Sequence, residues 1–338
     1  MPVLLDIATR RGLADAQVEC LIALALYGGL TPARRLELDE AYRRTHHGSL
    51  DGLEAMLDAR YEAELPARIP VASFAHTPQA EARTVLAEMF TGASCGPCVG
   101  IDLALEAALR RYQPRDLAVL VYHQHTPSPD PLVSPSAEAR AKWYAFAGVP
   151  YLFVDGVKLD DEGGGKATDA ADIYRNKMQP AVDRALANPP QARLTLDTVR
   201  AGNIITARVV LNARSTAGRT PALRLHVALA EERVRYSGGN GIRFHPMVVR
   251  KMARDGAGLV VPATGTARIE VKFDLAAIGA ELKSYLDDYE KSTKAASGPF
   301  AFNEKTRGLD SSNLVVVAFV QEVASRRVLQ SVVARTTK

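Results

Sequence analysis

The chain of 338 residues has only three cysteines, one tryptophan and no long apolar run. A membrane-spanning helix needs about 20 consecutive apolar residues. The most apolar early segment, residues 20–27, is much shorter and lies after Asp15 and Glu19, so it predicts a buried helix. Three cysteines exclude the disulfide framework that stabilises small secreted domains. Cys20, alone in that helix, is expected to be a buried small apolar residue.

The first residues lack the pattern of a secretory signal peptide. Arg10 and Arg11 resemble the basic region of a leader, but acidic residues interrupt the segment after them and there is no small-residue cleavage site. We therefore expect either a cytoplasmic protein or one whose leader is absent from this sequence.

Charge is distributed unevenly along the chain. Residues 1–66 carry 7 Lys and Arg against 11 Asp and Glu, whereas residues 191–338 carry 23 against 13. A basic surface can attract nucleic acid or an anionic surface. Here the basic residues are scattered over strand-like segments without interleaved aromatics. This favours solvated strand residues, and we predict no nucleic-acid partner.

The spacing of apolar residues divides the chain into three parts. Residues 1–66 have helical periodicity and predict a small three-helix unit. Residues 67–190 alternate between strands and helices, which predicts an α/β domain. Beyond Asn188-Pro189-Pro190, residues 191–338 contain at least six strand-like segments and predict an antiparallel β-sandwich. The predicted fold class is thus multidomain α+β.

Three segments are less regular. A short strand is predicted near residues 69–74, within a proline-containing connector. The glycine-rich loop at 236–245 and the helix-like segment at 275–289 do not fit a sandwich.

The chain is organised around Cys95-Gly96-Pro97-Cys98. An apolar strand, residues 84–90, precedes these residues, and a helical segment, residues 99–112, comes after them. A thiolate at a helix N-terminus lies near unpaired N–H groups and the positive end of the helix dipole, which lower its pKa. The second thiol, one turn further on, can attack a mixed disulfide formed by the first. This order predicts dithiol redox chemistry.

A Cys-x-x-Cys pair is also half of a zinc site, and we considered this alternative. The other half would have to come from Cys20 or from His123-Gln-His125, whose spacing is wrong for a zinc site. We predict no metal ligand and no cofactor. Either histidine could instead lie beside the cysteines, the alternative being a polar strand end. Asp130 is interpreted as a turn residue, and His245 has no predicted partner.

The middle of the chain resembles the thioredoxin superfamily. The resemblance comes from Cys95-Gly-Pro-Cys98 between a strand and a helix, and from Gly148-Val149-Pro150 before an apolar strand. The second motif resembles a loop that carries a cis-proline beside the cysteines. Residues 70–338 resemble secreted bacterial thioredoxin-like proteins with a C-terminal β-sandwich, including the 28-kilodalton outer-membrane-protein-like family. The segments that carry this wider resemblance are 88–95, 129–131, 238–245 and 317–321.

The resemblance implies a thiol–disulfide oxidoreductase that acts on protein disulfides in an extracytoplasmic compartment. Cys95, exposed at the start of the helix, would attack, and Cys98 would resolve the mixed disulfide. Pro150 would keep a backbone N–H away from the cysteines and leave Val149 to bind an extended substrate. Glu88, if buried, would relay a proton to or from Cys98.

Gly96 and Pro97 would form part of the same substrate-binding surface. The chain departs from the thioredoxin pattern at two positions. Ser94 replaces a tryptophan, and Glu88 lies seven residues before the first cysteine where the family has an acid at six. The alternative function is an envelope binding or structural protein, in which the thioredoxin unit is a scaffold and the β-sandwich contacts a partner.

Overall fold

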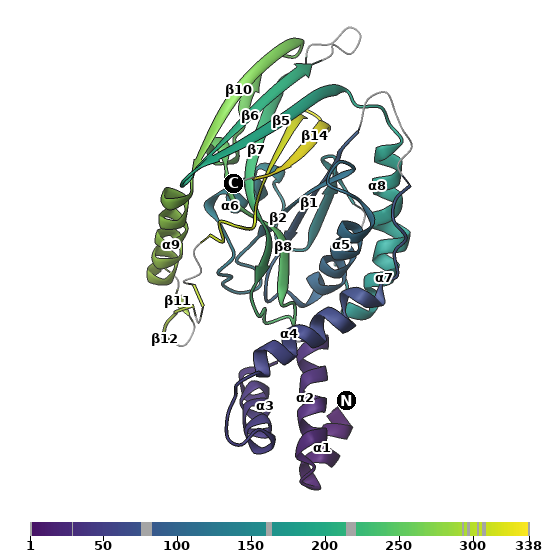
Figure 1. Cartoon of the computed structure of the whole chain (residues 1–338), viewed down its shortest axis with the longest axis vertical. Helices are drawn as coiled ribbons and strands as arrows, with labels where there is room; N and C mark the ends of the chain where they lie inside the picture. Colours follow the sequence, from purple (N-terminus) through teal and green to yellow (C-terminus); the bar gives the residue numbers. More distant parts are fainter. Residues whose placement is uncertain are drawn as a thin grey trace.

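The computed structural model describes residues 2–28, 30–75, 83–159, 164–213, 221–292, 294–295, 298–302, 304–305 and 309–336. Within these ranges the predicted fold class is confirmed. Helices form the N-terminal unit, a mixed sheet with helices forms the centre, and antiparallel strands lie toward the C-terminus (Figure 1). No helix in the described ranges combines the length and the apolar character needed to cross a membrane.

The N-terminal unit has four helices where the sequence predicted three. They are α1 (Pro2–Arg10), α2 (Ala14–Gly28), α3 (Pro32–Thr45) and α4 (Leu53–Glu64). At the start of α3, the side chain of Thr31 accepts a hydrogen bond from Arg34 N, and Pro32 occupies the first turn, as expected for this pair. The strand predicted near 69–74 does not form, because residues 69–75 belong to no helix or strand.

The central part has the predicted order of strands and helices. Its elements are β1 (Val85–Thr91), α5 (Val99–Arg111), β2 (Leu117–His123), α6 (Pro135–Tyr144), β3 (Tyr151–Val154) and β4 (Val157–Lys158). The last helical segment of this part is divided into α7 (Ala170–Ile173) and α8 (Gln179–Leu186), joined by a π-helical turn at Tyr174–Met178. All residues of β1 and β2 are buried, because helices or other strands cover both faces.

The C-terminal part contributes most of the strands. They are β5 (Ala192–Ala201), β6 (Ile204–Ala213), β7 (Leu223–Arg235), β8 (Phe244–Met252), β9 (Leu259–Val261), β10 (Gly265–Asp274), β13 (Leu314–Glu322) and β14 (Val328–Arg335). Two short strands, β11 (Lys294–Ala295) and β12 (Gly298–Pro299), pair with each other. The helix-like segment is a helix, α9 (Leu275–Ser292).

One sheet runs through both the central and the C-terminal parts. Its order is β14-β13-β7-β8-β2-β1-β3-β4, with β9 added beside β7. Strand β8 makes the connection, since it is antiparallel to β7 and parallel to β2, where Val121 is opposite Val248. The chain leaves α8 at Leu186 and enters β5 at Ala192, and strands from both sides of the predicted boundary near residue 190 share a sheet.

The remaining strands complete the β-sandwich. β6 lies between β5 and β10 in a three-stranded sheet. Its inner residues pack against β7 and β13 in one buried cluster, to which Ile205 and Val209 contribute from β6 and Leu225 and Val316 from the large sheet. β5 has alternating burial, whereas nearly all of β13 is buried, because β13 has the sandwich on one face and the central core on the other.

Candidate functional site

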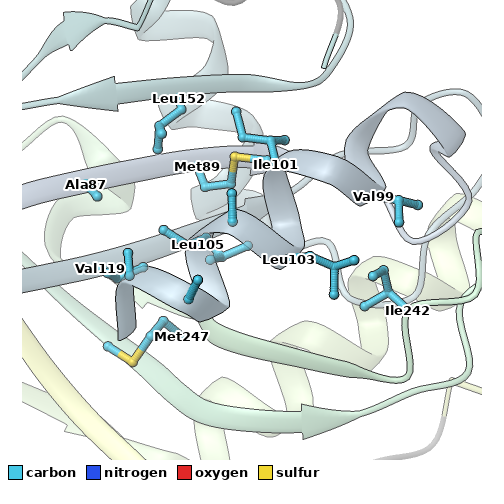
Figure 2. Packing of buried hydrophobic residues seen from close by; sticks show 14 of the residues in the cluster. Ala87, Met89, Val99, Ile101, Leu103, Leu105, Val119, Leu152, Ile242 and Met247 are labelled. Atoms are coloured by element: carbon cyan, nitrogen blue, oxygen red, sulfur yellow. The ribbon is translucent and has the colours of Figure 1, made fainter. Parts of the chain in front are cut away.

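The cysteine motif lies between the end of β1 and the start of α5. Gly96–Cys98 form a 3₁₀ turn, and α5 begins at the next residue. The first turns of α5 are anchored in the core, because Val99, Ile101 and Leu103 are buried together with Met89 of β1 and with Ile242 (Figure 2). Cys95 and Cys98 form a disulfide at this helix start. The motif is therefore fixed on rigid elements at the positive end of a helix.

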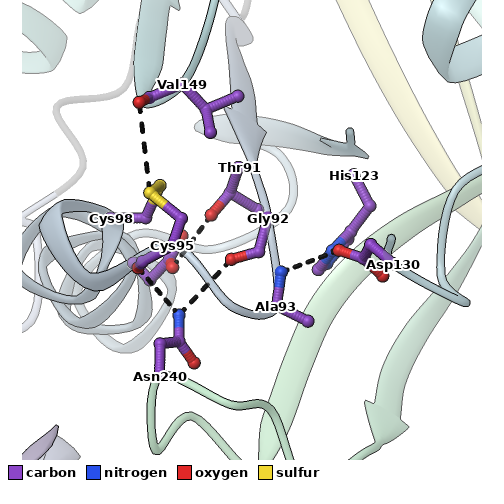
Figure 3. The surroundings of a disulfide bond; sticks show 10 residues. Thr91, Gly92, Ala93, Cys95, Cys98, His123, Asp130, Val149 and Asn240 are labelled. Atoms are coloured by element: carbon purple, nitrogen blue, oxygen red, sulfur yellow. Dashed lines mark hydrogen bonds and ion pairs between the residues drawn. A yellow bond between two sulfur atoms is a disulfide. The ribbon is translucent and has the colours of Figure 1, made fainter. Parts of the chain in front are cut away.

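Cys95 is buried, which corrects the prediction that it is exposed. Its relative exposure is 2%, and Cys98 is fully buried. Asn240, from the loop after β7, donates a hydrogen bond from Nδ2 to the carbonyl of Cys95 at 3.1 Å (Figure 3). A loop of the C-terminal part thus lies directly against the motif, a contact that sequence periodicity could not predict.

The predicted substrate-binding residues lie around the disulfide. Gly96 and Pro97 are exposed. The carbonyl oxygen of Val149 is 4.0 Å from Cys95 Sγ (Figure 3), and the Val149–Pro150 peptide bond is cis. Pro150 is buried and has no N–H, so no backbone donor at this position competes for the sulfur atoms. The structure thus brings Val149 to the first cysteine, with Pro150 directly after it in the chain.

A second loop, which includes residues 164–165, packs against Pro97 and Gly100. The N–H of Gly165 donates to the carbonyl of Pro97 at 2.6 Å, and the N–H of Gly100 donates to the carbonyl of Gly165 at 2.8 Å. A Cβ atom at Gly164 would lie 2.1 Å from that Pro97 oxygen. Residues 164–165 are thus packed onto the motif as closely as backbone atoms allow.

Glu88 is not placed to exchange a proton with Cys98, which corrects its predicted role. Its carboxylate accepts hydrogen bonds from Arg140 Nε and Nη2 at 2.7 and 2.8 Å, and from the hydroxyls of Tyr122 and Tyr144. Alternate residues of a strand face opposite sides of the sheet. Glu88 faces α6, whereas Thr91 faces α5, which carries the cysteine motif at its start. Glu88 is therefore part of a buried ion pair.

Asp102 is the acidic residue on the cysteine side, and it was not among the predicted site residues. It lies four residues after Cys98 on α5, and such a pair shares a helix face with Cβ atoms about 5–6 Å apart. Its Oδ2 accepts a hydrogen bond from Thr91 Oγ1 at 3.0 Å. Burial raises the pKa of Asp102 to about 8, although the hydrogen bond from Thr91 lowers it. The helical spacing from Cys98 was the signal that could have identified it.

Asp130 supports the loop that leads into the motif and is more than a turn residue. Its fully buried carboxylate accepts hydrogen bonds from the N–H of Ala93 at 2.7 Å and of Leu132 at 2.8 Å. His123 Nδ1 is 2.7 Å from the same carboxylate (Figure 3). Burial alone would raise the pKa of Asp130, but His123 and the two N–H donors lower it below its usual value. Asp130 thus connects His123 to the backbone just before Cys95.

The other histidines lie farther along the same network. His125 Nε2 is 3.0 Å from the hydroxyl of Tyr285, and its ring stacks on Tyr289 of α9. The ring of His245 meets that of His123 edge to face, with centroids 4.9 Å apart. Burial lowers the pKa of His125 to about 4 and that of His245 to about 3. In the described ranges, no three side chains from His, Cys, Asp and Glu are grouped to hold a metal ion.

Comparison with known proteins adds information on the fold. No protein-family model and no curated protein sequence matches the chain. Among solved structures, HBP35 of Porphyromonas gingivalis is similar over 77% of this chain and 77% of that chain, with a TM-score of 0.51 and 15% identity. A domain of the outer membrane lipoprotein Omp28 from the same organism matches 44% of this chain and 91% of that chain, with a TM-score of 0.25 and 14% identity. The first likeness concerns the fold, and the second supports no further conclusion.

Proposed function

We propose that this protein is a thiol–disulfide oxidoreductase of the thioredoxin superfamily that acts on disulfides of other proteins. One observation carries the proposal: Cys95 and Cys98 are bonded to each other at the start of α5, with the carbonyl of Val149 4.0 Å from Cys95 Sγ. A dithiol at a helix N-terminus, next to a backbone segment that can bind an extended chain, has the parts that disulfide exchange requires.

The reaction needs no cofactor, because its electrons come from thiols. In the reduced protein, the thiolate of Cys95 attacks a sulfur of the partner's disulfide. A mixed disulfide forms and one partner thiolate leaves. Cys98 then attacks Cys95 Sγ, which closes the Cys95–Cys98 bond and releases the second partner thiolate. We assign to Asp102 the proton exchange with Cys98 that was first expected of Glu88.

An oxidising compartment suits this chemistry, and we place the protein outside the cytoplasm. Disulfides of partner proteins form and persist where thiols are not kept reduced. The resemblance to secreted thioredoxin-like proteins supports the same location. Partners of the reaction are protein thiols and disulfides.

Insulin reduction tests the proposal. Dithiothreitol and the full-length protein are mixed with insulin, and precipitation of the reduced B chain is monitored by turbidity. We expect the protein to shorten the lag, Cys95→Ser to abolish this effect, and Cys20→Ser to retain it, since Cys20 is a free cysteine of the helical unit. Wild-type protein that is no faster than Cys95→Ser would overturn the proposal.

A second function is favoured by the burial of Cys95, which is 2% exposed. A covered disulfide suits an envelope protein that uses this fold as a scaffold and contacts a partner through the β-sandwich. Such a protein would give the same insulin lag with and without Cys95, and its disulfide would resist dithiothreitol unless the protein was unfolded.

A further inference from the structure

The loop between β7 and β8, residues 236–243, covers the cysteine motif, and we call it the cover loop. It has a compact shape of its own. The N–H of Tyr236 donates to the carbonyl of Arg243 at 3.0 Å, and that of Gly238 donates to the carbonyl of Ile242 at 2.8 Å. The side-chain oxygen of Asn240 accepts from the N–H of Ile242 at 3.1 Å. The cover loop is therefore held together by its own hydrogen bonds, and its ends are fixed in two paired strands.

Asn240 is the residue at the tip of the cover loop that binds the motif. Its backbone N–H donates to the carbonyl of Ala93 at 3.2 Å. Its Nδ2 donates to the carbonyls of Cys95 at 3.1 Å and Gly92 at 3.4 Å (Figure 3). Asn240 is 3% exposed. One side chain and its own backbone thus hold three of the four carbonyl groups between positions 92 and 95.

Two glycines let the cover loop approach this closely. A Cβ atom at Gly238 would lie 2.5 Å from the carbonyl oxygen of Ala93, and one at Gly239 would lie 3.0 Å from Ser94 Oγ. Ser94 replaces the tryptophan that thioredoxins carry before the first cysteine. An indole ring pointing the same way would overlap with Gly239, so the small residue at 94 and the cover loop fit each other.

The base of the cover loop is held by the N-terminal helices. Arg235 and Arg243, one at each end, both pair with Glu54 and Asp58 of α4. Arg243 Nε is 2.6 Å from Asp58, and Arg243 is 4% exposed. Burial alone would raise the pKa of Glu54, but Arg243 and the other guanidinium groups lower it to about 2. Part of the basic charge of the C-terminal third thus pairs with the acidic helical unit, which corrects our interpretation of that charge as solvated strand residues.

Space for movement lies behind the cover loop. A pocket of about 690 Å³ is lined by both the cover loop and the helical unit, including Leu26, Leu30 and Leu57 and residues 237–239. Within the motif, Gly96 and Pro97 are exposed, whereas Cys95 is 2% exposed. A small thiol that approaches over Gly96 and Pro97 needs little room, whereas a folded protein would also meet the cover loop.

We propose that the cover loop, through Asn240, determines which partners reach Cys95, and that α4 holds it in place through Arg235 and Arg243. Small thiols reach the buried disulfide after only small local displacements, and protein thiols react quickly only when the cover loop moves away. In either reaction a thiolate attacks Cys95 Sγ, the Cys95–Cys98 bond breaks with its electron pair on Cys98, and a second thiol of the reductant then releases Cys95. The inference rests on the proposed function only in taking this disulfide as the reacting group.

The test compares two reductants on full-length protein. Reduction of the Cys95–Cys98 disulfide by dithiothreitol, and separately by reduced thioredoxin as a folded protein dithiol, is measured by alkylation and mass spectrometry. The variants are Asn240→Ala, which removes the side-chain bonds to the motif, and Glu54→Gln with Asp58→Asn, which releases the base of the cover loop without a change near the cysteines. Asn188→Ala and Glu270→Gln, far from the cover loop in the chain, are the matched controls. Thermal melts show which variants are folded.

Each lost hydrogen bond costs about 1 kcal/mol, so the loss of two raises the ratio of open to closed cover loop by more than about tenfold. We therefore expect both variants to raise the rate with thioredoxin by about tenfold or more, with much less change for dithiothreitol and none in the controls. Equal changes with both reductants, or no change with either, would overturn the inference. Since Glu54 and Asp58 lie on a surface helix, that variant decides the matter if Asn240→Ala does not fold. If the rates diverge as expected but wild-type protein shortens the insulin lag no more than Cys95→Ser does, the proposed function fails and this inference stands.

Discussion

The carboxylate of Glu88 and the guanidinium of Arg140 form a two-point ion pair, at 2.7 and 2.8 Å, and neither side chain has any solvent exposure. The pair lies between β1 and α6, and Gln321 of β13 accepts a hydrogen bond from the same guanidinium. It therefore joins the central and C-terminal parts of the large sheet. The ion pair is therefore a structural element of the core, and its position does not allow it to take part in the chemistry of the disulfide.

Glu88→Gln is expected to destabilise the protein strongly, because it leaves Arg140 as a buried charge without its partner. Breaking a buried pair in this way costs about 3–5 kcal/mol of unfolding free energy, measurable by urea denaturation. The double change Glu88→Met with Arg140→Met removes both charges, and we expect it to cost less than Glu88→Gln alone. The pH dependence of disulfide reduction in folded Glu88→Gln should equal that of the wild type. A shifted pH profile would show that Glu88 influences the chemistry of the disulfide.

Asp102→Asn is expected to flatten the dependence of stability on pH. Burial raises the pKa of Asp102 to about 8 in the folded protein, from 3.8. The folded state therefore retains a proton that the unfolded chain releases. The stability from this proton is complete below pH 4 and is lost as pH rises to about 8. By linkage, the wild type should lose up to ~1.4 kcal/mol per pH unit across this window, and the variant should lose less.

The measurement for Asp102 is the unfolding free energy at several pH values from 5 to 9. Asp172→Asn, which removes an exposed helical carboxylate, is the control and should keep the wild-type slope. Equal slopes for Asp102→Asn and the wild type would show that this carboxylate is ionised throughout, and it could not then hold the proton assigned to it.

The sequence predicted the parts of the site that depend on local order. The cysteines, the helix after them and Pro150 lie close together in the chain or in one supersecondary unit, so spacing and resemblance were sufficient. Asn240 lies 145 residues after Cys95, and no local pattern connects the two. Glu88 was assigned from its distance along the chain. The alternation of β1, which sends Glu88 to α6 and Thr91 to α5, decides which acid faces the cysteines.

Gly100→Ala and Gly279→Ala should have opposite effects, although both glycines lie in helices. Alanine normally stabilises a helix by about 1 kcal/mol relative to glycine. At Gly279 of α9, a Cβ atom would meet nothing within 4 Å, and we expect that gain. At Gly100 of α5, it would lie 2.8 Å from the carbonyl oxygen of Lys166 and 2.9 Å from Gly165. We expect a loss of about 1–3 kcal/mol there, as in overpacked cores.

Thermal unfolding of the two glycine variants measures both effects. Gly100→Ala should also speed alkylation of the reduced cysteines, because residues 164–165 must move away from Pro97. A stabilised Gly100→Ala would mean that this loop does not press on α5.

The fold was predictable where apolar periodicity is regular, and β8 shows where it was not. β8 contains Pro246, which cannot donate to a ladder, and Met247 has a positive φ of 52°. Because of these features, the sequence of β8 lacks the regular pattern of a strand, although β8 joins the two halves of the large sheet. The pairing of β2 with β8 is also a contact between distant segments, which strand propensity cannot specify. The sandwich was therefore predicted as a separate domain, although one of its sheets is continuous with the central one.

Asp130→Asn should destabilise the loop before Cys95 at neutral pH. The buried carboxylate accepts hydrogen bonds from two backbone N–H groups and is bonded to His123 Nδ1. A neutral amide would bind these groups less strongly. We expect a loss of about 2–3 kcal/mol. Because His123 and the N–H donors hold the pKa of Asp130 below 3.8, its contribution is complete above pH 3.8 and is lost as pH falls through the folded-state pKa. The difference between variant and wild type in urea unfolding should therefore be large at pH 7 and shrink toward pH 3.

Asp197→Asn, on the exposed face of β5, should cost little at either pH. A difference for Asp130→Asn that does not change with pH would show that the loss is one of packing and owes nothing to the charge.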